Sequence, residues 1–219
     1  MNIRYVVFDL DGTLLNTLDD LFLSVNKILS DHGYKTRSKN EVRSYLGNGV
    51  RALLDLALPE EERFRTDELL PEFKAYYDLH KEDNTAPYAG VKEAVAEIKK
   101  AGVKCAIVSN KFDAAVQELK NVTFSGLIDF ACGEREGVKP KPAPDGVFLA
   151  MNELGADPAE TVYVGDSEVD LATANNSGLK CVAVSWGFRD RDELVKRGAK
   201  NIADTPEQMK DFILSGNVL

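Results

Sequence analysis

The stretch Ile3-Arg4-Tyr5-Val6-Val7-Phe8-Asp9-Leu10-Asp11-Gly12-Thr13 joins a run of strand-forming residues to a pair of carboxylates. Its apolar part is nearly continuous, which is typical of a strand that is buried on both faces of a parallel sheet. Strand alternation puts Asp9 and Asp11 on the same side, while Leu10 points into the fold. Open parallel sheets bind ligands beyond the carboxyl ends of their strands, so both carboxylates lie where an active site is expected.

Four later runs also have the composition of buried strands, and helical patterns separate them. The expected strands cover residues 3–10, 103–109, 128–132, 161–165 and 179–185. The helical patterns cover residues 91–100, 114–119, 148–154 and 171–175, and Thr205-Pro206 predicts the start of a closing helix. This alternation predicts an α/β fold with a doubly wound parallel sheet.

More than 90 residues separate the first expected strand from the second, far more than one crossover helix needs. Helical signals fill most of this segment. They are a capping box formed by Ser38 and Glu41, an amphipathic pattern over 50–58 and a charged helical pattern over 60–80. The sequence therefore predicts an α-helical domain at residues 15–85, inserted into a core made of residues 1–14 and 86–219.

Composition excludes several classes of function for this chain of 219 residues. With 27 Lys plus Arg against 36 Asp plus Glu, the formal net charge is −9, and no basic cluster favours nucleic acid. No apolar run approaches the roughly 18 residues of a membrane helix, and no signal-type segment is recognisable, so we expect a cytoplasmic protein. The chain has two histidines, too few for a zinc site of several imidazoles. We expect Cys105, Cys132 and Cys181 to be buried thiols.

Carboxylates are therefore the main chemistry available, and further polar side chains follow other expected strands. Ser109 and Asn110 follow the second strand, and Asp166 and Asp170 follow the fourth. Asp9, Asp166 and a backbone carbonyl near Asp11 predict a site of hard oxygen ligands, which suits Mg²⁺ better than zinc. An EF-hand calcium loop is excluded, because it needs glycine at its sixth position, where Leu14 stands.

A proline-rich segment before the fourth strand contains Lys139 and Lys141. Its prolines fix the backbone and so limit where the two lysines can point. A carboxylate that attacks a phosphate dianion meets charge repulsion, and a lysine together with a divalent cation offsets it. We expect Lys141 to face the site and Lys139 to be a solvated surface residue.

The order of these segments resembles the four motifs of the haloacid dehalogenase-like hydrolase superfamily. The resemblance extends from Asp9 to Asp170 and implies a Rossmannoid core, a small helical cap that closes over the substrate, and Mg²⁺ as cofactor. It implies the following catalytic roles: Asp9 as nucleophile, Asp11 as general acid and base, Ser109 as the phosphate-binding hydroxyl, and Lys141 as the charge-balancing lysine. It also implies a metal site made of Asp9, Asp11, Asp166 and Asp170.

The implied reaction has two halves. Asp9 attacks phosphorus while protonated Asp11 gives its proton to the leaving oxygen, and Asp11 then activates the water that hydrolyses the aspartyl-phosphate. For this, Asp11 must hold its proton near neutral pH. We expect a second carboxylate close by and closure of the cap to favour the protonated form.

Three shorter segments, at residues 45–49, 108–111 and 163–167, look like those of phosphoglycolate phosphatases. This implies 2-phosphoglycolate as the substrate. The expected substrate-binding residues are Thr13, Asn48, Gly49, Asn110 and Lys111. The turn at 47–49 can equally be a plain connection, and Arg51 and Lys111 either supply positive charge to a substrate carboxylate or lie solvated at the surface.

Other functions remain open at this point. A phosphosugar mutase of the β-phosphoglucomutase type shares the nucleophile and the cap, but tends to have Glu where this chain has Gly165. A pyrophosphatase and a broad sugar-phosphate phosphatase are harder to separate, whereas a non-catalytic binding module would be expected to lack the nucleophile. Asn16 stands at a position where many relatives carry a second acidic residue.

The expected partner is a small phosphorylated metabolite, with no nucleic acid and no membrane, and the chain is expected to be a monomer or a homodimer. No role follows for residues 186–189.

Overall fold

The computed structural model describes all 219 residues and divides into two compact units. The core unit comprises Met1–Leu15 and Pro87–Leu219, and the cap unit comprises Asn16–Ala86. At the two places where the chain passes between the units, β2 (Leu15–Asn16) and β3 (Ala86–Pro87) pair as a two-stranded sheet. These two-residue strands are too short to leave a periodic signal in the sequence.

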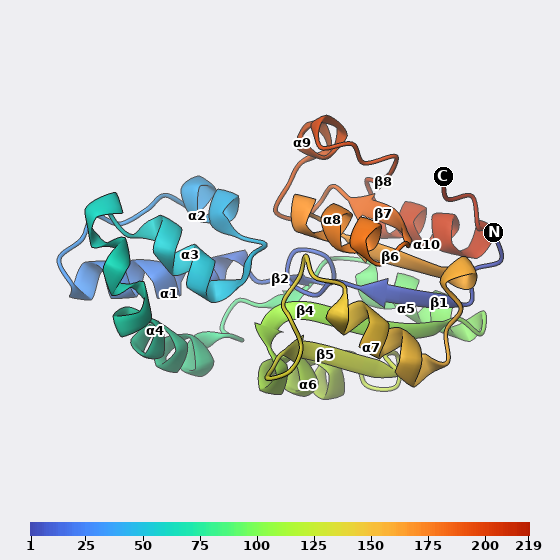
Figure 1. Ribbon diagram of the computed structural model, residues 1–219, viewed down its shortest axis with the longest axis horizontal. Helices are drawn as coiled ribbons and strands as arrows, with labels where there is room; N and C mark the ends of the chain where they lie inside the picture. Colours follow the sequence, from blue (N-terminus) through green and yellow to red (C-terminus); the bar gives the residue numbers. More distant parts are fainter. The chain divides into compact units, whose positions relative to one another are not determined.

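The core unit contains a six-stranded sheet in the order β5-β4-β1-β6-β7-β8, and every pairing within it is parallel (Figure 1). The strands are β1 (Tyr5–Phe8), β4 (Lys104–Phe112), β5 (Phe130–Glu134), β6 (Thr161–Gly165), β7 (Lys180–Val184) and β8 (Asn201–Ala203). From β1 the chain builds outward to β5 on one side, then returns to add β6, β7 and β8 on the other. The predicted doubly wound parallel sheet is confirmed.

Helices cover both faces of this sheet, as the near-continuous apolar strands predict. Val6 and Phe8 of β1 pack in one buried cluster, and Tyr5 and Val7 pack in the other. The first cluster contains side chains of α5 (Val91–Lys100), α6 (Asp113–Val122) and α10 (Pro206–Ser215). The second contains side chains of α7 (Asp145–Leu154) and α8 (Glu168–Asn176). Burial on both faces thus fixes the side to which each residue of β1 points.

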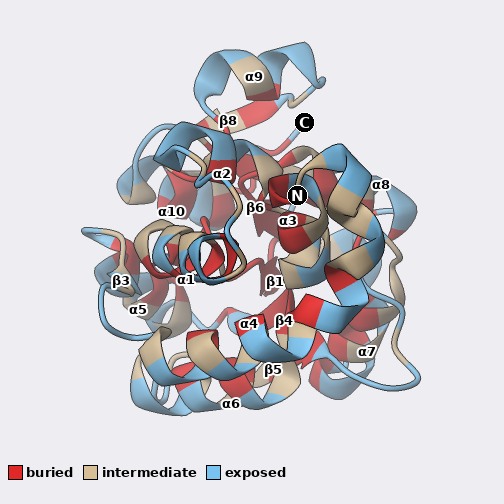
Figure 2. Cartoon of the chain, turned by 90° about the vertical axis from the view of Figure 1, so that its left-hand side faces the viewer, coloured by how far each residue is buried: buried red, intermediate tan, exposed pale blue.

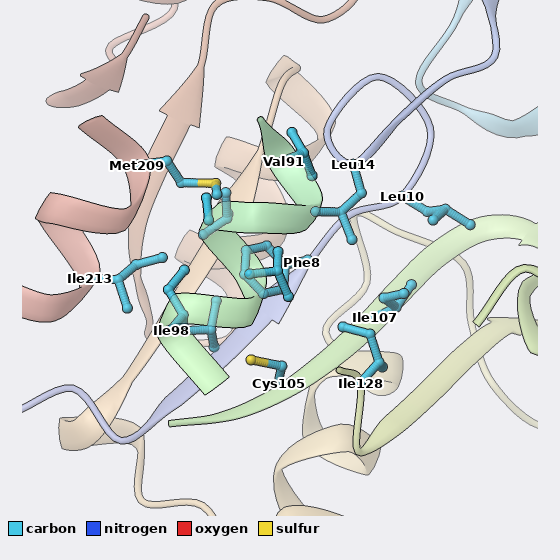
Figure 3. Packing of buried hydrophobic residues seen from close by; sticks show 14 of the residues in the cluster. Phe8, Leu10, Leu14, Val91, Ile98, Cys105, Ile107, Ile128, Met209 and Ile213 are labelled. Carbon is cyan, nitrogen blue, oxygen red and sulfur yellow. The ribbon is translucent and has the colours of Figure 1, made fainter. Parts of the chain in front are cut away.

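Figure 3 shows the first cluster from close by, with Phe8 lying against α5 near Ile98. Met209 and Ile213 of α10 extend the same apolar layer. Complete burial of such a side chain contributes about 1.5–3 kcal/mol relative to exposure. The layer therefore stabilises the strand whose end carries the first carboxylates.

Several sequence predictions about the core unit need correction. β8 and α9 (Arg191–Lys196) had no predicted range, because three and six residues carry little periodicity. β4 continues to Phe112, beyond the expected end at 109, with a shift of register after Val108. Cys105 and Cys132 are buried as expected, whereas Cys181 is half-buried, and all three thiols are free.

The cap unit is helical, with α1 (Leu18–Asp31), α2 (Lys39–Tyr45), α3 (Gly49–Ala57), the 3₁₀ helix η1 (Glu60–Arg65) and α4 (Thr66–His80). The expected capping box forms at the start of α2, where Ser38 and Glu41 exchange hydrogen bonds. The predicted helical stretch 60–80 is divided into η1 and α4, and α1 had no predicted range.

The helices α1, α3 and α4 each bury several apolar side chains, and buried, intermediate and exposed segments are mixed along the cap helices in Figure 2. Val25, Leu53 and Phe73, from three different helices, are fully buried. No helix of either unit combines the length and the apolar character that crossing a membrane requires.

Candidate active site

The carboxyl ends of three neighbouring strands carry the predicted site residues. Asp9 follows β1, Ser109 lies in the last part of β4, and Asp166 follows β6, in the sheet order β4-β1-β6. The backbone N–H of Asp9 donates to the carbonyl of Val164 at 2.8 Å, which continues the parallel ladder up to the carboxylate. Because parallel strands end at the same edge, residues more than 150 positions apart in the chain are brought together.

Lys141 reaches this edge from the loop before α7. Its Nζ lies 2.6 Å from Oδ1 of Asp9 and 2.8 Å from Oδ1 of Asp170, and donates to the Tyr163 hydroxyl at 3.2 Å. The lysine side chain is 4% exposed. Lys139, two residues earlier, is exposed as expected. The structure therefore brings one of the two lysines into the site as a bridge between two buried carboxylates.

Asn110 holds the backbone of Lys141 in place. Its side-chain Nδ2 donates to the Lys141 carbonyl at 3.0 Å, and its Oδ1 accepts from the Lys141 N–H at 2.8 Å. The side-chain amide thus makes the same pair of hydrogen bonds to a peptide group that a neighbouring β-strand would make. The amide group of Asn110 thus positions a neighbouring segment of the site, and its contact with a substrate stays a prediction.

Asp170 accepts hydrogen bonds from several buried donors. Lys141 and the Tyr163 hydroxyl donate to its Oδ1, while the backbone N–H of Asp166 and both the N–H and the hydroxyl of Ser167 donate to its Oδ2. Burial acts to raise the pKa of Asp170, but the charge of Lys141 and these donors hold it below its ordinary value. Asp170 is thus kept ionised and fixed in orientation.

Gly165 packs directly against Asp170. A Cβ at position 165 would overlap the Asp170 side chain, so the close approach of strand and helix requires glycine. The sequence argument used this glycine to favour a hydrolase over a mutase. The structure gives Gly165 a packing reason as well, and so weakens that argument.

Asp166 is fully buried and accepts one hydrogen bond on each carboxylate oxygen. The hydroxyl of Thr13 donates to Oδ1 at 3.0 Å, and the backbone N–H of Phe188 donates to Oδ2 at 2.6 Å. The side chain of Thr13 is completely buried, and its hydroxyl orients Asp166. Contact of Thr13 with a substrate stays a prediction.

The site carries more negative than positive charge. Asp9, Asp166 and Asp170 form a cluster in which one ligand oxygen from each lies within 4.8 Å of the others. Burial raises the pKa of Asp9 well above its ordinary value, although Lys141 opposes this effect. Burial, reinforced by the charge of Asp170, raises the pKa of Asp166 to about 7.

Such carboxylates need a cation to be fully ionised at neutral pH. Clustered carboxylate oxygens with excess negative charge fit a hard divalent ion such as Mg²⁺. Asp9 and Asp166 fit the role of direct ligands best, because each has lone pairs that the protein leaves available. Asp170 already accepts several hydrogen bonds, so it fits a supporting role.

Asp11 is half-buried, and its Oδ1 lies 3.0 Å from Nζ of Lys111. The backbone N–H of Lys111 donates to the hydroxyl of Ser109 at 3.1 Å, within the last part of β4. Asp11 thus has a cation as its charged partner, whereas the sequence led us to expect a second carboxylate close by. Lys111 was expected to bind substrate, and its direct partner here is a carboxylate of the site.

The remaining predicted substrate-binding residues lie in the cap unit. Asn48 is exposed at the start of α3 and makes no capping hydrogen bond with its side chain, and Gly49 has a φ of 81°, which favours glycine. Arg51 forms a two-pronged ion pair with Asp67, at 2.8 and 2.9 Å. Contact of Asn48, Gly49 and Arg51 with a substrate therefore stays a prediction.

Comparison with known proteins gives three kinds of match. A model of the haloacid dehalogenase-like hydrolase family matches residues 6–184. A phosphoglycolate phosphatase of Aquifex aeolicus is 31% identical over 186 residues, which is 84% of this chain and 86% of the relative. An N-acetylmuramic acid 6-phosphate phosphatase of Pseudomonas aeruginosa is 30% identical over 224 residues, which is 97% of this chain and 96% of the relative.

A solved structure from Lactobacillus delbrueckii subsp. bulgaricus, provisionally assigned as a phosphoglycolate phosphatase, is also similar. Its TM-score is 0.93 at 34% sequence identity, and the match covers 98% of this chain and 99% of the other. The family match begins in β1 and ends with β7, so it includes the strand ends that carry Asp9, Ser109 and Asp166.

Proposed function

Because the chain belongs to the haloacid dehalogenase-like hydrolase family, we propose that it is a Mg²⁺-dependent phosphatase that forms an aspartyl-phosphate on Asp9. The family and its named relatives show the enzyme class, a phosphoric monoester hydrolase. The metal, the residue roles and the substrate are the content of this proposal. The cytoplasmic location stays a prediction.

The observation that carries the proposal is the bridge from Lys141 to Asp9 and Asp170. In the first half-reaction, a carboxylate oxygen of Asp9 forms a bond to phosphorus as the bond to the leaving oxygen breaks. Negative charge on Asp9 and on the phosphoryl oxygens opposes this approach, and the Lys141 ammonium, 2.6 Å from Asp9, offsets it. Asp170 and Asn110 hold the lysine in position.

Asp11 supplies the proton that the leaving oxygen takes up, and then removes a proton from the water that attacks the aspartyl-phosphate. The second step forms the bond from water to phosphorus, breaks the bond to Asp9 and releases inorganic phosphate. The Lys111 ammonium lies 3.0 Å from this carboxyl group. We infer that Lys111 leaves Asp11 for an anionic group of the substrate before Asp11 acts as an acid.

Asp9 and Asp166 would hold Mg²⁺, with Asp170 in support, and the chemistry of this oxygen donor set fits the ion. Mg²⁺ bound there supplies positive charge that stabilises the developing charge on the phosphoryl group. Thr13 and Phe188 fix the orientation of Asp166 for that purpose.

For the substrate we propose 2-phosphoglycolate, because several relatives bear that name and because Lys111 offers a cation for a second anionic group. A second candidate is a sugar phosphate. It is favoured by the similarity, over 97% of the chain, to an N-acetylmuramic acid 6-phosphate phosphatase.

A substrate panel tests these proposals under identical Mg²⁺ concentrations. The panel contains 2-phosphoglycolate, N-acetylmuramic acid 6-phosphate, a hexose phosphate and pyrophosphate. We expect 2-phosphoglycolate to give the highest kcat/KM, and both chelation of Mg²⁺ and the Asp9→Asn variant to abolish turnover. A higher kcat/KM for the sugar phosphates would support the second candidate. Full activity of Asp11→Asn, or turnover in the presence of a chelator, would contradict the mechanism.

A further inference from the structure

The loop that follows β7, residues 186–189, supplies no side chain to the proposed reaction, yet it lies directly against Asp166. We propose that this loop, here called the β7 loop, is a positioning element that fixes the Asp166 carboxylate and thereby sets the affinity of the site for Mg²⁺. The inference rests on the Mg²⁺ site of the proposed function. It concerns residues for which the sequence suggested no role.

Gly187 gives the closest contact between the loop and the site. A Cβ at this position would overlap the carbonyl oxygen of Gly12 and the carboxylate of Asp166. A Cβ at Gly12 would overlap the same carboxylate from its own loop. The Asp166 carboxylate therefore lies in a slot between two glycines. Gly187 does not have a positive φ, so space and not backbone conformation explains the glycine.

Phe188 supplies the hydrogen bond that sets the plane of the carboxylate. Its backbone N–H donates to Oδ2 of Asp166 at 2.6 Å, and the hydroxyl of Thr13 donates to Oδ1 at 3.0 Å. Both donors are buried, so water does not compete with either contact. One fixed donor on each oxygen leaves the remaining lone pairs of Asp166 in defined directions.

Trp186 connects the same loop to the first acidic segment. Its indole Nε1–H donates to the carbonyl of Thr13 at 3.0 Å, and its ring packs beside Tyr88 with the ring centroids 6.5 Å apart. Thr13 follows Asp11 in the chain by two residues. The β7 loop thus touches both strand ends that supply carboxylates to the site, those of β1 and β6.

Arg189 anchors the other end of the loop. Its guanidinium forms two hydrogen bonds of 2.9 Å to the carboxylate of Glu168, the first residue of α8, and its side chain is 5% exposed. A two-pronged pair of this kind is geometrically specific. The loop is therefore held at both ends, and Gly187 and Phe188 between them cannot move away from Asp166 easily.

Groups that orient a metal-binding carboxylate contribute to affinity because the ligand does not have to be reorganised when the ion binds. Loss of such an outer contact typically costs about 10–100-fold in metal affinity. We therefore expect the β7 loop to act on Mg²⁺ binding more than on the chemical step that follows it. This separates a positioning role from a general contribution to folding.

The test uses Gly187→Ala in the full-length protein and measures Mg²⁺ binding without turnover. Trp186 is the only tryptophan of the chain, so its fluorescence reports on this loop directly. In the wild type we expect a saturable change of emission with Mg²⁺. In Gly187→Ala we expect the midpoint to rise about 10–100-fold. At saturating Mg²⁺, kcat should fall by a smaller factor.

Ser185→Ala is the matched control, because the Ser185 hydroxyl donates to Asp204 and the Ala203 carbonyl, away from the site. Its Mg²⁺ midpoint should equal that of the wild type. Trp186→Phe is the second test variant, which keeps an aromatic ring but loses the donor to Thr13. Because this variant has no tryptophan, its Mg²⁺ binding is measured by thermal melts, as the Mg²⁺ concentration at which half of the Mg²⁺-induced increase in Tm is reached. We expect that concentration to rise about 3–10-fold.

The outcomes separate the two proposals. Wild-type midpoints in folded Gly187→Ala and Trp186→Phe would overturn the positioning role and leave the proposed phosphatase intact. A decrease of Tm that is equal with and without Mg²⁺ would also overturn the positioning role, because it would show a general loss of stability. If Gly187→Ala does not fold, the midpoint of Trp186→Phe decides. A wild type that shows no response to Mg²⁺ would overturn the metal in the proposed function, and this inference with it.

Discussion

The core unit and the cap unit place their charged residues in opposite ways. The core unit buries Asp9, Lys141 and Asp166 at the edge of its sheet. The cap unit keeps most of its ion pairs at the surface, as in the pair of Arg51 with Asp67, and Asp20 is the one charged residue that it buries. Exposed pairs contribute little to stability, whereas buried charges cost free energy unless they are paired.

The comparison teaches where selection for chemistry overrides selection for folding. A fold that needed only stability would not bury several carboxylates around one lysine, because burial, and to a smaller extent repulsion by Asp170 and Asp166, raises the pKa of Asp9. In the cap unit, by contrast, nearly all charged side chains remain in contact with water. Four predictions sharpen this contrast.

The largest expected effect is that of Asp9→Asn on turnover. Replacement of the proposed nucleophile should lower kcat by at least about 10⁴-fold, as for other residues that make the covalent bond. The same change removes one buried negative charge from an acidic cluster, so the Tm of the metal-free protein should stay equal or rise. Phosphate release and a thermal melt measure the two effects. A strongly lowered Tm would show that Asp9 is structural and would break the contrast between the units.

Lys141→Met should have the next largest effect, on stability as well as on activity. It leaves Asp9 and Asp170 buried without their shared cation, and removal of one partner of a buried ion pair costs about 3–5 kcal/mol. Urea unfolding measures this free energy. Lys139→Met is the matched control, because Lys139 is exposed two residues earlier, and it should not change the unfolding midpoint. Equal effects of the two variants would contradict the role given to Lys141.

In the cap unit, Asp20→Ala should have a smaller effect than Lys141→Met. The Asp20 carboxylate accepts hydrogen bonds from the backbone N–H groups and side chains of Asn84 and Thr85, at 2.7 to 3.1 Å. Their loss should lower the free energy of unfolding by about 2–3 kcal/mol. Asp19→Ala, which removes only an exposed ion pair with Lys39, should leave it unchanged. A similar loss in both variants would mean that burial of Asp20 is not the cause.

The smallest effect concerns pH and metal removal. Burial raises the pKa of Asp166 to about 7 in the folded chain, whereas the unfolded carboxyl ionises near 3.8. Its contribution to stability is therefore fully present below the unfolded pKa and is lost as the pH rises toward about 7. Mg²⁺ competes with the retained proton, so it should raise Tm by several degrees more at about pH 8 than at about pH 5.5.

Asp166→Asn is the control for this prediction. In that variant, the added stabilisation by Mg²⁺ at the higher pH should disappear, because the titrating ligand is gone. An equal increase of Tm at both pH values in the wild type would show that Mg²⁺ does not bind at Asp166.

Much of the site could be predicted from the sequence because it depends on local patterns. Alternation in the first strand placed Asp9 and Leu10 on opposite sides, and Leu10 is completely buried. The prolines around Lys139 and Lys141 suggested that one of these lysines faces the site, and Lys141 is in contact with Asp9. The approximate ends of most core helices also follow from their apolar periodicity.

Other features depend on which segments meet in space, and no local pattern encodes them. The amide of Asn110 fits the backbone of Lys141, 31 residues away, and the Lys111 ammonium finds Asp11, 100 residues away. The signal that could have revealed the β7 loop is the pair Trp186 and Gly187 after the last long strand. Without the position of Asp166 beside it, that pair is only a turn.

The sequence by itself thus determined the strand and helix periods, the α/β class, the helical character of the inserted segment and the carboxylates at the strand ends. These follow from backbone geometry and burial within short segments. Only the tertiary structure decided which donor meets which oxygen: Thr13 and Phe188 on Asp166, Lys141 between Asp9 and Asp170. The physical reason is that hydrogen bonds and ion pairs act over about 3 Å, a distance set by packing of distant segments and not by their order along the chain.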